Sequence, residues 1–379
     1  MKLAIDCRYI LDPNNGQFGG ISEYTDGLAR ALLELETDHE FVLFFSDKYS
    51  GDLAISKSGV KIVRVSVKRG NFFFNHFIFP WIVRSHRPDI FFSPHGQLPL
   101  GWWGRAVVTI HDLAIFDHPE WFPGGFFKWF STKIVVPISL RRAEKIVVVS
   151  ETTKNDLKRI FGVCDKKIFV VYPGCPLRCV RLQTLTPPPS PGYGGHGLPP
   201  LPRAALGQRG RYFLCLGTIE PRKNFILAAR AIKILREKFP DVKLLIAGGR
   251  GWKFSETVRE FDPGFVEELG FVSLEQKAEL LAGAQALVFP SLYEGFGLPP
   301  LEAMKLGVPV ITTRSGALPE VCGEAASYVS INDPAELAQV MEKMFDEKLR
   351  TEYIEKGLKQ AEKFSWKKSA EEILKNVSL

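Results

Sequence analysis

Two sets of short β-branched runs, which alternate with segments of helical period, constrain the fold of this chain more than any other feature. The first set lies at residues 2–5, 41–45, 61–66, 90–93, 106–111, 145–149 and 168–172. The second set lies at 212–216, 243–247, 265–269, 286–289 and 308–312, between helical periods at 225–238, 275–283, 301–306 and 334–345. Such alternation is typical of βαβ units with a mainly parallel sheet. We therefore expect an α/β protein with two doubly wound halves.

The stretch between the two halves is unlike either of them. Residues 173–210 are rich in proline and glycine and have little periodicity, which is typical of a linker. No Asp or Glu occurs between Asp165 and Glu220, so a local anomaly such as a shifted reading frame is an alternative. The predicted organisation is an N-terminal Rossmann-like acceptor domain at 1–172, the linker at 173–210, a C-terminal Rossmann-like donor domain at 211–362 and a last helix at 363–379. A chain of 379 residues is long enough for two cores.

Composition excludes several classes of protein. A net charge of +7, with 45% hydrophobic and 24% charged residues, is an ordinary globular balance. The basic surplus is too diffuse for a nucleic-acid-binding protein and suits an anionic substrate or an anionic membrane surface. The six cysteines are scattered without zinc spacing, which favours reduced thiols in a cytoplasmic protein. Asp6 and Arg8 stand where a signal peptide would need an apolar run, and no run is long enough to span a bilayer.

A loop with two glutamates follows the apolar run at 286–289. It contains Glu294-Gly-Phe-Gly and continues through two prolines to Glu302. The glycines let backbone N–H groups approach a ligand, and the prolines place Glu302 in the first turn of a helix, where phosphate binds well. The helix dipole alone would explain Glu302, but a carboxylate at Glu294, beside a buried strand, needs a partner. We expect both carboxylates to bind hydroxyl groups on either side of a phosphate.

Two cations, Arg222 and Lys223, directly precede another predicted helix. The helix dipole disfavours positive charge at this end unless an anion is bound there. A diphosphate would turn that local cost into binding, with the arginine acting as a bidentate fork. A solvated basic turn is the alternative interpretation.

Two weaker signals lie in the first half. Gly19 and Gly20 belong to a glycine-rich turn before the first helix, but the turn lacks the spacing of a dinucleotide fingerprint or a P-loop. His111, followed by Asp112, closes an apolar strand, where α/β sheets place their ligands. A lone histidine is more often structural, so this signal needs the others beside it.

Together these motifs resemble the retaining glycosyltransferases of family 4, a large bacterial group with two Rossmann-like domains that face each other across a cleft, the GT-B fold. The resemblance covers nearly the whole chain, and its strongest part is the pair Glu294 and Glu302, separated by seven residues. The ending Phe364-Ser-Trp366 is similar to the family's last helix, which crosses back to the N-terminal domain. The departure is the linker, which puts the hinge between the domains in question.

The resemblance implies a role for each candidate residue. Arg222 and Lys223 would neutralise the donor diphosphate, which the backbone at Gly19 and Gly20 would approach from the other domain. Glu302 would bind the ribose, the backbone of Val272 would contact the base, and His111 would orient the transferred sugar. The hydroxyl groups of that sugar would be held by Glu294 and by the backbone of Gly295, Phe296, Gly297 and Leu298. His111, Arg222, Lys223 and Glu294 would form the catalytic set.

The implied activity is that of a hexosyltransferase of mannose or glucose type, acting with retention in surface polysaccharide synthesis. Its donor would be a GDP- or UDP-linked sugar, which is a substrate, and its acceptor a glycan or a lipid-linked intermediate. No cofactor and no metal are expected, because the chain has no Asp-x-Asp motif and fixed cations can stabilise the leaving group. Attack from the front face is favoured over a covalent intermediate, because Asp112 is the one carboxylate in the His111 region.

The first half also carries many aromatic residues interleaved with cations. The aromatics occur at 72–74, 77, 79, 81, 102–103, 121–122, 126–127 and 129–130, among Lys68, Arg69, Arg84, Arg87, Arg105 and Lys128. We expect a face that contacts an anionic membrane from the cytoplasmic side and receives a lipid-linked acceptor. Burial of these aromatics in the core is the alternative.

Two other functions are compatible with the same architecture. A nucleotide-sugar epimerase would need acid and base residues around the anomeric carbon and would release nucleotide without transferring the sugar. A non-catalytic nucleotide-sugar-binding protein would bind the donor and neither transfer nor hydrolyse it. A dehydrogenase is disfavoured, because the first turn lacks the required glycine spacing.

Overall fold

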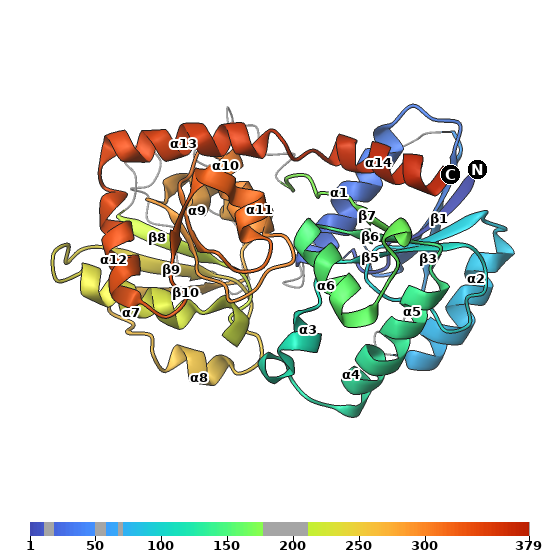
Figure 1. The fold of residues 1–379 in the computed structure, drawn as a ribbon, viewed down its shortest axis with the longest axis horizontal. Helices are drawn as coiled ribbons and strands as arrows, with labels where there is room; N and C mark the ends of the chain where they lie inside the picture. Colours follow the sequence, from blue (N-terminus) through green and yellow to red (C-terminus); the bar gives the residue numbers. More distant parts are fainter. Residues whose placement is uncertain (11–18, 50–57, 67–70, 177–210, 379) are drawn as a thin grey trace, which may run out of the picture. The chain divides into compact units, whose positions relative to one another are not determined.

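The computed structural model describes residues 1–10, 19–49, 58–66, 71–176 and 211–378, with the side chains of 127, 128 and 378 excepted. The chain forms two compact units (Figure 1). The first comprises Met1–Pro176 and Phe364–Leu379, and the second, Leu177–Lys363, is described from residue 211 onward. The predicted linker at 173–210 lies outside the described residues except for 173–176, so the domain boundaries stay a prediction.

A parallel sheet of seven strands forms the centre of the first unit. Its order is β3-β2-β1-β4-β5-β6-β7. The strands are β1 (Lys2–Asp6), β2 (Glu40–Ser46), β3 (Val60–Val65), β4 (Ile90–Ser93), β5 (Ala106–Ile110), β6 (Lys145–Val148) and β7 (Ile168–Val170). The helices are α1 (Gly20–Glu34), α2 (Phe79–Ser85), α3 (Ala114–Asp117), α4 (Phe126–Phe130), α5 (Val136–Arg142), α6 (Glu151–Phe161) and α14 (Trp366–Ser378), with π-helical turns η1 (Phe74–Ile78) and η3 (Ser131–Val135) and 3-10 turns η2 (Pro119–Trp121) and η4 (Asp165–Lys167).

The second unit has a parallel sheet of six strands, in the order β10-β9-β8-β11-β12-β13. The strands are β8 (Tyr212–Leu216), β9 (Lys243–Ala247), β10 (Val266–Gly270), β11 (Leu287–Phe289), β12 (Val310–Thr313) and β13 (Ala326–Val329). The helices are α7 (Phe225–Leu235), α8 (Phe254–Val258), α9 (Leu274–Gly283), α10 (Leu298–Lys305), α11 (Leu318–Cys322), α12 (Pro334–Lys343) and α13 (Glu347–Ala361), with 3-10 turns η7 (Pro221–Lys223) and η8 (Gly323–Ala325).

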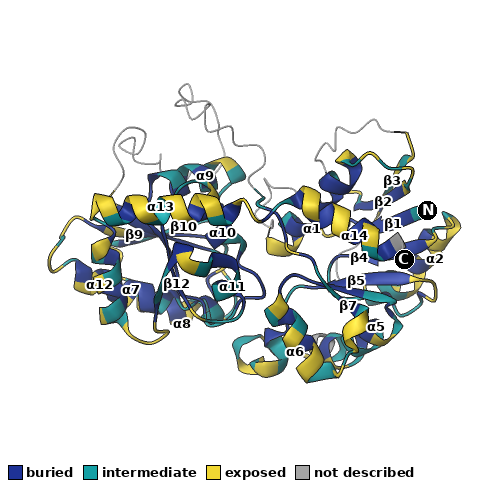
Figure 2. Cartoon of the chain, turned by 45° about the horizontal axis from the view of Figure 1, so that its top comes forward, coloured by how far each residue is buried: buried dark blue, intermediate teal, exposed yellow. Residues whose placement is uncertain are grey.

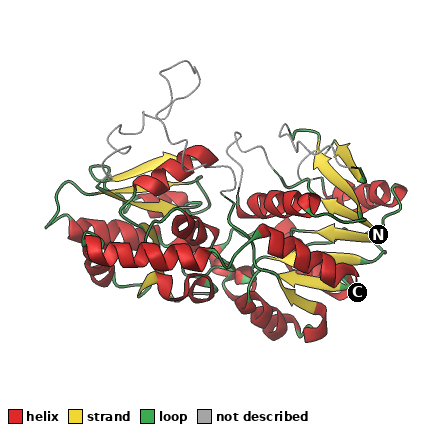
Figure 3. Ribbon diagram, turned by 90° about the horizontal axis from the view of Figure 1, so that it is seen from above, coloured by secondary structure: helices red, strands yellow, loops and turns green. Residues whose placement is uncertain are grey.

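In each unit the core lies between the sheet and its helices. The central strands are buried, and the covering helices turn exposed faces outward (Figure 2). Strands and helices alternate in layers through both units (Figure 3). Strands β5 and β8 have every residue buried, as continuous apolar runs in a parallel sheet require. The predicted α/β class with two parallel, doubly wound sheets is therefore confirmed.

The last helix belongs to the first unit, where α14 lies beside α1 (Figure 1). Trp366, only 2% exposed, packs so closely on Gly27 of α1 that a Cβ at Gly27 would overlap the indole ring. The indole Nε1 donates to the carbonyl of Cys175 at 3.1 Å, and Ser369 Oγ donates to the carbonyl of Tyr172 at 2.5 Å. The end of the chain is thus built into the core of the unit that contains its beginning.

Candidate active site

The candidate donor site lies where the second sheet reverses its winding. Strands β8 and β11 are neighbours, but the chain builds β9 and β10 on one side of them and β12 and β13 on the other. The loops that follow β8 and β11 therefore lie next to each other at the carboxyl ends of the strands, where open α/β sheets bind ligands. These two loops carry Arg222 and Lys223, and Glu294.

A four-residue charge cluster joins the two loops. Lys223 Nζ lies 2.6 Å from Glu294 Oε1, and Arg222 Nη1 lies 3.1 Å from Glu294 Oε2. Arg222 also pairs with Glu220, with Nη2 at 2.9 Å from Oε1. No side chain in the cluster is more than 14% exposed. The partner that Glu294 was predicted to need is thus provided by the predicted cation pair.

Burial and the neighbouring charges shift the protonation equilibria within this cluster. Burial lowers the pKa of Lys223 and raises that of Glu220. For Glu294, burial acts to raise the pKa, but the charges of Arg222 and Lys223 outweigh it and hold the pKa below its ordinary value. The neighbouring cations thus favour the charged form of Glu294, while burial opposes the charged forms of Lys223 and Glu220.

Backbone contacts fix the two loops against each other. The Leu292 N–H donates to the carbonyl of Arg222 at 2.8 Å, and Arg222 Nη1 donates to the carbonyl of Tyr293 at 3.0 Å. Gly316, with φ +57°, lies so close to Glu294 that a Cβ there would overlap the Glu294 backbone. Because glycine alone fits this position, it determines the backbone position of the glutamate.

Helix α10 begins three residues earlier than the predicted 301–306. Gly297 is its N-cap, with φ +111°, and the helix runs Leu298–Lys305. The placement of Glu302 in the first turn is therefore wrong, since Glu302 lies in the second turn. The reason is that Pro299 and Pro300 fill the first turn, where their missing N–H groups cost nothing. Of the first three residues of α10, only Leu298 has an N–H, so this helix start offers an anion few donors.

Glu302 is fully buried and pairs with a cation that the sequence analysis missed. Lys277 Nζ, on α9, lies 2.6 Å from Glu302 Oε1. Helix α9 begins at Leu274, two residues after Val272, with a capping box between Ser273 and Gln276. This ion pair holds the predicted ribose-binding and base-contacting segments together. A lysine one turn into a helix carries no local signal, because its partner is 25 residues away.

His111 lies at the carboxyl end of β5 in the first unit. Its Nε2 donates to the carbonyl of Pro94 at 2.7 Å, and its ring meets the Tyr24 ring edge-on, with centroids 4.7 Å apart. Burial lowers the pKa of His111. The neighbouring Asp112 accepts from the Ala114 N–H at 3.2 Å and so caps α3. The ring is therefore neutral and fixed in one orientation.

Gly19 and Gly20 form the start of α1. Gly19 is the N-cap in an extended conformation, with φ −133°. A Cβ added at either glycine would meet no described atom within 4 Å. The packing of the described residues therefore does not require glycine at these two positions.

A cavity of about 400 Å³ follows β1 and β4 in the first unit, and the sequence analysis did not predict it. Its polar residues include Arg8, Asn75 and His95, and its aromatic residues include Phe72 and Phe130. Asp6 and Arg8 entered the sequence analysis only as an argument against a signal peptide. Asp6 and Arg8 could have indicated the cavity, because an acid and a base two residues apart at the end of a buried strand carry charges that are costly to bury without a structural or functional role.

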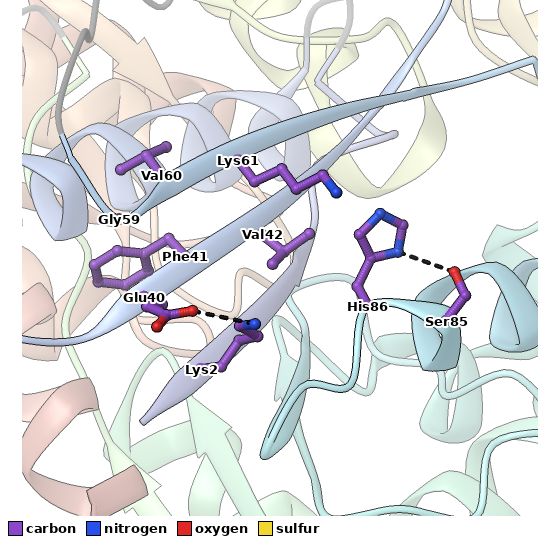
Figure 4. A pocket seen from close by; sticks show the side chains of 9 residues that line it. All are labelled: Lys2, Glu40, Phe41, Val42, Gly59, Val60, Lys61, Ser85 and His86. Atoms are coloured by element: carbon purple, nitrogen blue, oxygen red, sulfur yellow. Dashed lines mark hydrogen bonds and ion pairs between the residues drawn. The ribbon is translucent and has the colours of Figure 1, made fainter.

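A larger cavity, of about 600 Å³, lies at the opposite edge of the same sheet. Figure 4 shows it at the start of β1, β2 and β3, with Lys2 paired to Glu40, and with Lys61 and His86 nearby. The amino ends of parallel strands are not where such sheets bind their substrates. This cavity is therefore not part of the candidate site.

The described residues contain neither a cluster of metal ligands nor a membrane-spanning helix. Within them, no group of three or more His, Cys, Asp or Glu residues is arranged to hold a metal ion. No helix in the described ranges is long and apolar enough to cross a membrane. The expected independence from metal stays a prediction.

Comparison with known proteins identifies the family. Residues 18–178 match the family described as Glycosyltransferase Family 4, and residues 210–347 match Glycosyl transferases group 1. The chain is 34% identical over 295 residues to the O-antigen chain mannosyltransferase B of Escherichia coli, covering 76% of this chain and 73% of that protein. It is 42% identical over 297 residues to the MMP alpha-(1->4)-mannosyltransferase of Mycolicibacterium hassiacum, covering 77% of this chain and 63% of that protein.

The fold has counterparts among solved structures. Anabaena HepE, solved in complex with UDP-glucose, aligns over 100% of this chain and 99% of its own with a TM-score of 0.70 and 15% sequence identity. At that identity the likeness shows the fold alone, which is GT-B. The chain belongs to glycosyltransferase family 4, and it is a glycosyltransferase. The predicted family, fold and enzyme class are confirmed.

Proposed function

We propose that this enzyme transfers a hexose of mannose type, with retention and without a metal, from a GDP- or UDP-linked donor to a glycan or lipid-linked acceptor of a surface polysaccharide. The names of two relatives support mannose, since both are called mannosyltransferases. The UDP-glucose bound to Anabaena HepE supports a nucleotide-linked donor and leaves glucose and uracil as the alternative sugar and base.

The observation that carries this proposal is the buried cluster of Arg222, Lys223 and Glu294 at the switch point of the second sheet. Departure of a nucleoside diphosphate concentrates negative charge on its terminal phosphate. Two cations already oriented and shielded from water stabilise that charge without reorganisation, which is a large source of rate acceleration. Because Pro299 and Pro300 remove N–H donors from α10, the side chains of Arg222 and Lys223 carry most of this task.

We propose the remaining donor contacts from the family resemblance. Glu302, held by Lys277, binds the ribose, and the backbone at Val272 contacts the base. Glu294 and the loop through Gly295, Phe296, Gly297 and Leu298 bind the hydroxyl groups of the sugar. Gly19 and Gly20, where packing does not require glycine, allow the backbone to approach the diphosphate.

For the chemical step we propose that the acceptor hydroxyl attacks the anomeric carbon on the same face of the sugar from which the leaving group departs. His111, neutral and fixed by its bond to Pro94, orients the transferred sugar through a hydrogen bond. Asp112 is engaged in capping α3, which disfavours it as a covalent nucleophile. The acceptor hydroxyl loses its proton to a phosphate oxygen of the departing diphosphate as the new glycosidic bond forms.

The test is transfer in the presence of EDTA, with GDP-mannose, GDP-glucose, UDP-glucose and UDP-mannose offered separately. We expect turnover with one of them, an α-linked product by NMR, and thermal stabilisation by the matching diphosphate. A ligand at 100 times its Kd stabilises by about 2.7 kcal/mol. Activity that requires added metal, or an inverted product, would refute the mechanism, and nucleotide release without transfer would favour an epimerase.

We also propose that the first unit contacts anionic membranes. Several aromatics are strongly exposed there, with Trp81 at 73%, Phe126 at 70% and Trp103 at 69%. The guanidinium of Arg142 lies 4.0 Å from the Trp103 ring centre, as in side chains that anchor at bilayer interfaces. Other predicted members, such as Phe79 and Trp102, are buried in the core, and Lys68 and Arg69 lie outside the described residues.

Flotation with phosphatidylglycerol vesicles tests this contact. The wild type is expected to float with anionic vesicles, and the variant Trp81→Ser/Phe126→Ser to remain at the bottom of the gradient. Because both side chains project into solvent, the variant keeps its folded circular dichroism spectrum. A wild type that fails to float would refute the proposal.

A further inference from the structure

We propose that the cavity after β1 and β4 binds an uncharged hexose ring of the acceptor and presents its hydroxyl group beside His111. This inference rests on the proposed function, since it assigns the second substrate of that reaction to a place in the first unit. It specifies the chemistry of the acceptor at this point, which is a neutral sugar and not a phosphate.

The position of the cavity is the first argument. In the first sheet the winding reverses between β1 and β4, because β2 and β3 lie on one side of this pair and β5, β6 and β7 on the other. Arg8 follows β1 and His95 follows β4, and both line the cavity. The cavity therefore occupies the switch point of its sheet, as the charge cluster does in the second unit.

The polar floor of the cavity is rigid. Arg8 donates to both carboxylate oxygens of Asp6, at 2.8 and 2.7 Å, and its Nη1 donates to Asn75 Oδ1 at 2.8 Å. His95 Nε2 lies 3.0 Å from Asp6 Oδ2. The guanidinium also lies 3.3 Å from the centre of the Phe79 ring. Planar polar groups fixed in this way are ready to bind hydroxyl groups without an entropic penalty.

The charge balance of the floor selects an uncharged ligand. Asp6 is fully buried, and although burial acts to raise its pKa, Arg8 and His95 hold that pKa below its ordinary range, so the carboxylate cancels the charge of Arg8. Burial, followed by the charge of Arg8, lowers the pKa of His76 to about 4, which leaves this ring neutral. Arg8 is the one Lys or Arg among the described residues that line the cavity, and both oxygens of the Asp6 carboxylate accept from it, so a phosphate would find little positive charge there to offset its desolvation.

The walls suit the apolar faces of a sugar ring. Phe72 and Phe130 meet edge to face, with centroids 5.4 Å apart, and both line the cavity. Phe72 lies two residues before the π-helical turn η1. Phe130 is the last residue of α4, directly before the second π-helical turn, η3. Such turns often mark functional sites in helices. A volume of about 400 Å³ with aromatic walls and a few fixed polar groups is typical of a small-ligand site.

The cavity also lies beside the proposed reaction centre. Pro94, whose carbonyl accepts from His111 Nε2, directly precedes His95. The His95 ring in turn contacts Tyr9, with centroids 4.0 Å apart. A sugar ring seated on Arg8, Asn75 and His95 would thus contact the residue that directly follows Pro94, whose carbonyl binds His111.

The experiment measures binding and turnover separately. The probe for binding is methyl α-D-mannopyranoside, followed by saturation-transfer NMR on the full chain, with mannose 6-phosphate as the charged comparison. The variants are Phe130→Ala, which removes a wall, and Asn75→Leu, which keeps volume and removes the amide. Arg8→Ala is avoided because it would leave Asp6 buried without its cation. The control is Lys61→Met, in the cavity of Figure 4.

We expect saturation transfer to the uncharged sugar in the wild type and in Lys61→Met, and its loss in Phe130→Ala and Asn75→Leu. In turnover assays the KM for the acceptor should rise about tenfold in both cavity variants, the loss expected for one aromatic or hydrogen-bonding contact. The KM for the donor and the thermal shift with GDP or UDP should not change.

Three results would overturn the inference. They are unchanged sugar binding in both cavity variants, stronger binding of mannose 6-phosphate than of the neutral sugar, and a change in donor KM with acceptor KM intact. Failure of the proposed function would look different, because nucleotides would then give no thermal shift in the wild type. Sugar binding by NMR would still decide whether the cavity holds a hexose.

Discussion

At the scale of single residues, the Lys223–Glu294 pair is the feature with the greatest consequence. Both side chains are 10% exposed, and each is the other's counter-ion at 2.6 Å. A buried pair of this kind adds little stability compared with a pair of apolar residues, but removal of one partner leaves an uncompensated charge. The proposed function and the stability of the second unit therefore depend on the same two side chains.

Lys223→Ala is predicted to lower the free energy of unfolding of the second unit by about 3–5 kcal/mol, because Glu294 loses its nearest cation in a buried site. The variant Lys223→Met/Glu294→Gln, of similar shape and without the two charges, should recover most of that loss and still lack transfer activity. Urea unfolding followed by tryptophan fluorescence measures the first effect, and a transfer assay the second. Arg230→Met, in the exposed pair with Glu260, is the control and should change neither. Equal stability of Lys223→Ala and wild type would contradict the prediction.

His76 gives a prediction for pH dependence. Its pKa falls from an ordinary value of 6.5 to about 4 in the folded state, because of burial and then the charge of Arg8. The unfolded chain therefore takes up this proton at a higher pH than the folded chain does. The stabilisation is complete above pH 6.5 and is lost progressively as the pH falls toward 4. Urea midpoints between pH 7 and pH 5 should decline less in His76→Gln than in wild type, and equal slopes would count against this assignment.

At the scale of elements, α14 links the end of the chain to the His111 region. Trp366 contacts Tyr24 of α1, with ring centroids 5.6 Å apart. The Tyr24 ring in turn contacts the His111 ring, and the Tyr24 hydroxyl oxygen lies 3.4 Å from Thr109 Oγ1. Three elements, α14, α1 and β5, therefore meet around one tyrosine. This arrangement makes Tyr24 a positioning residue for His111, with Trp366 behind it.

Tyr24→Leu is predicted to lower kcat several-fold and leave the donor KM unchanged, because the His111 ring loses its edge-to-face neighbour. Tyr24→Phe keeps that ring contact and removes only the long hydroxyl contact to Thr109, so it should restore most of kcat. A purely structural role would instead reduce both variants in proportion to their loss of Tm. Steady-state kinetics with parallel Tm measurements separates the two explanations.

At the scale of the whole molecule, the residues proposed to bind ligands are placed by the same topological rule in both units. Each sheet is parallel and reverses its winding once in the middle, between β1 and β4 in one unit and between β8 and β11 in the other. Arg8 and His95 lie at that reversal in the first unit, and the Arg222–Lys223–Glu294 cluster lies at it in the second. One topological feature, used twice, thus places the residues of the two proposed binding sites.

Hydrogen exchange should therefore report two separate footprints. GDP or UDP is predicted to slow exchange at residues 217–224 and 291–302, because a bound diphosphate orders these loops. Methyl α-D-mannopyranoside should slow exchange at residues 72–76 and 95–98. A single footprint shared by both ligands would contradict the division of the two substrates between the units.

The sequence by itself determined most of the elements, and it predicted the residues of the candidate donor site. Apolar runs and their spacing are local properties, so all twelve predicted strands appear in the structure within about two residues of their predicted bounds. Among the strands of the described residues, only the short β13 was not predicted, and α10 begins earlier than predicted because two prolines fit its first turn. The need of Glu294 for a partner also followed from its neighbours alone, since a carboxylate beside a buried strand cannot stay without compensation.

Only the tertiary structure decided which residues meet. Glu294 pairs with Lys223 across 71 residues of sequence, and Glu302 with Lys277 across 25. Arg8, Asn75 and His95 line one cavity because β1 and β4 are neighbours in the sheet, and no local pattern states that order. Strand order is determined by the packing of whole βαβ units against one another, which sums contacts between residues far apart in the sequence. The cavity proposed for the acceptor, to which Arg8, Asn75 and His95 come from three separate segments, therefore follows only from the assembled sheet.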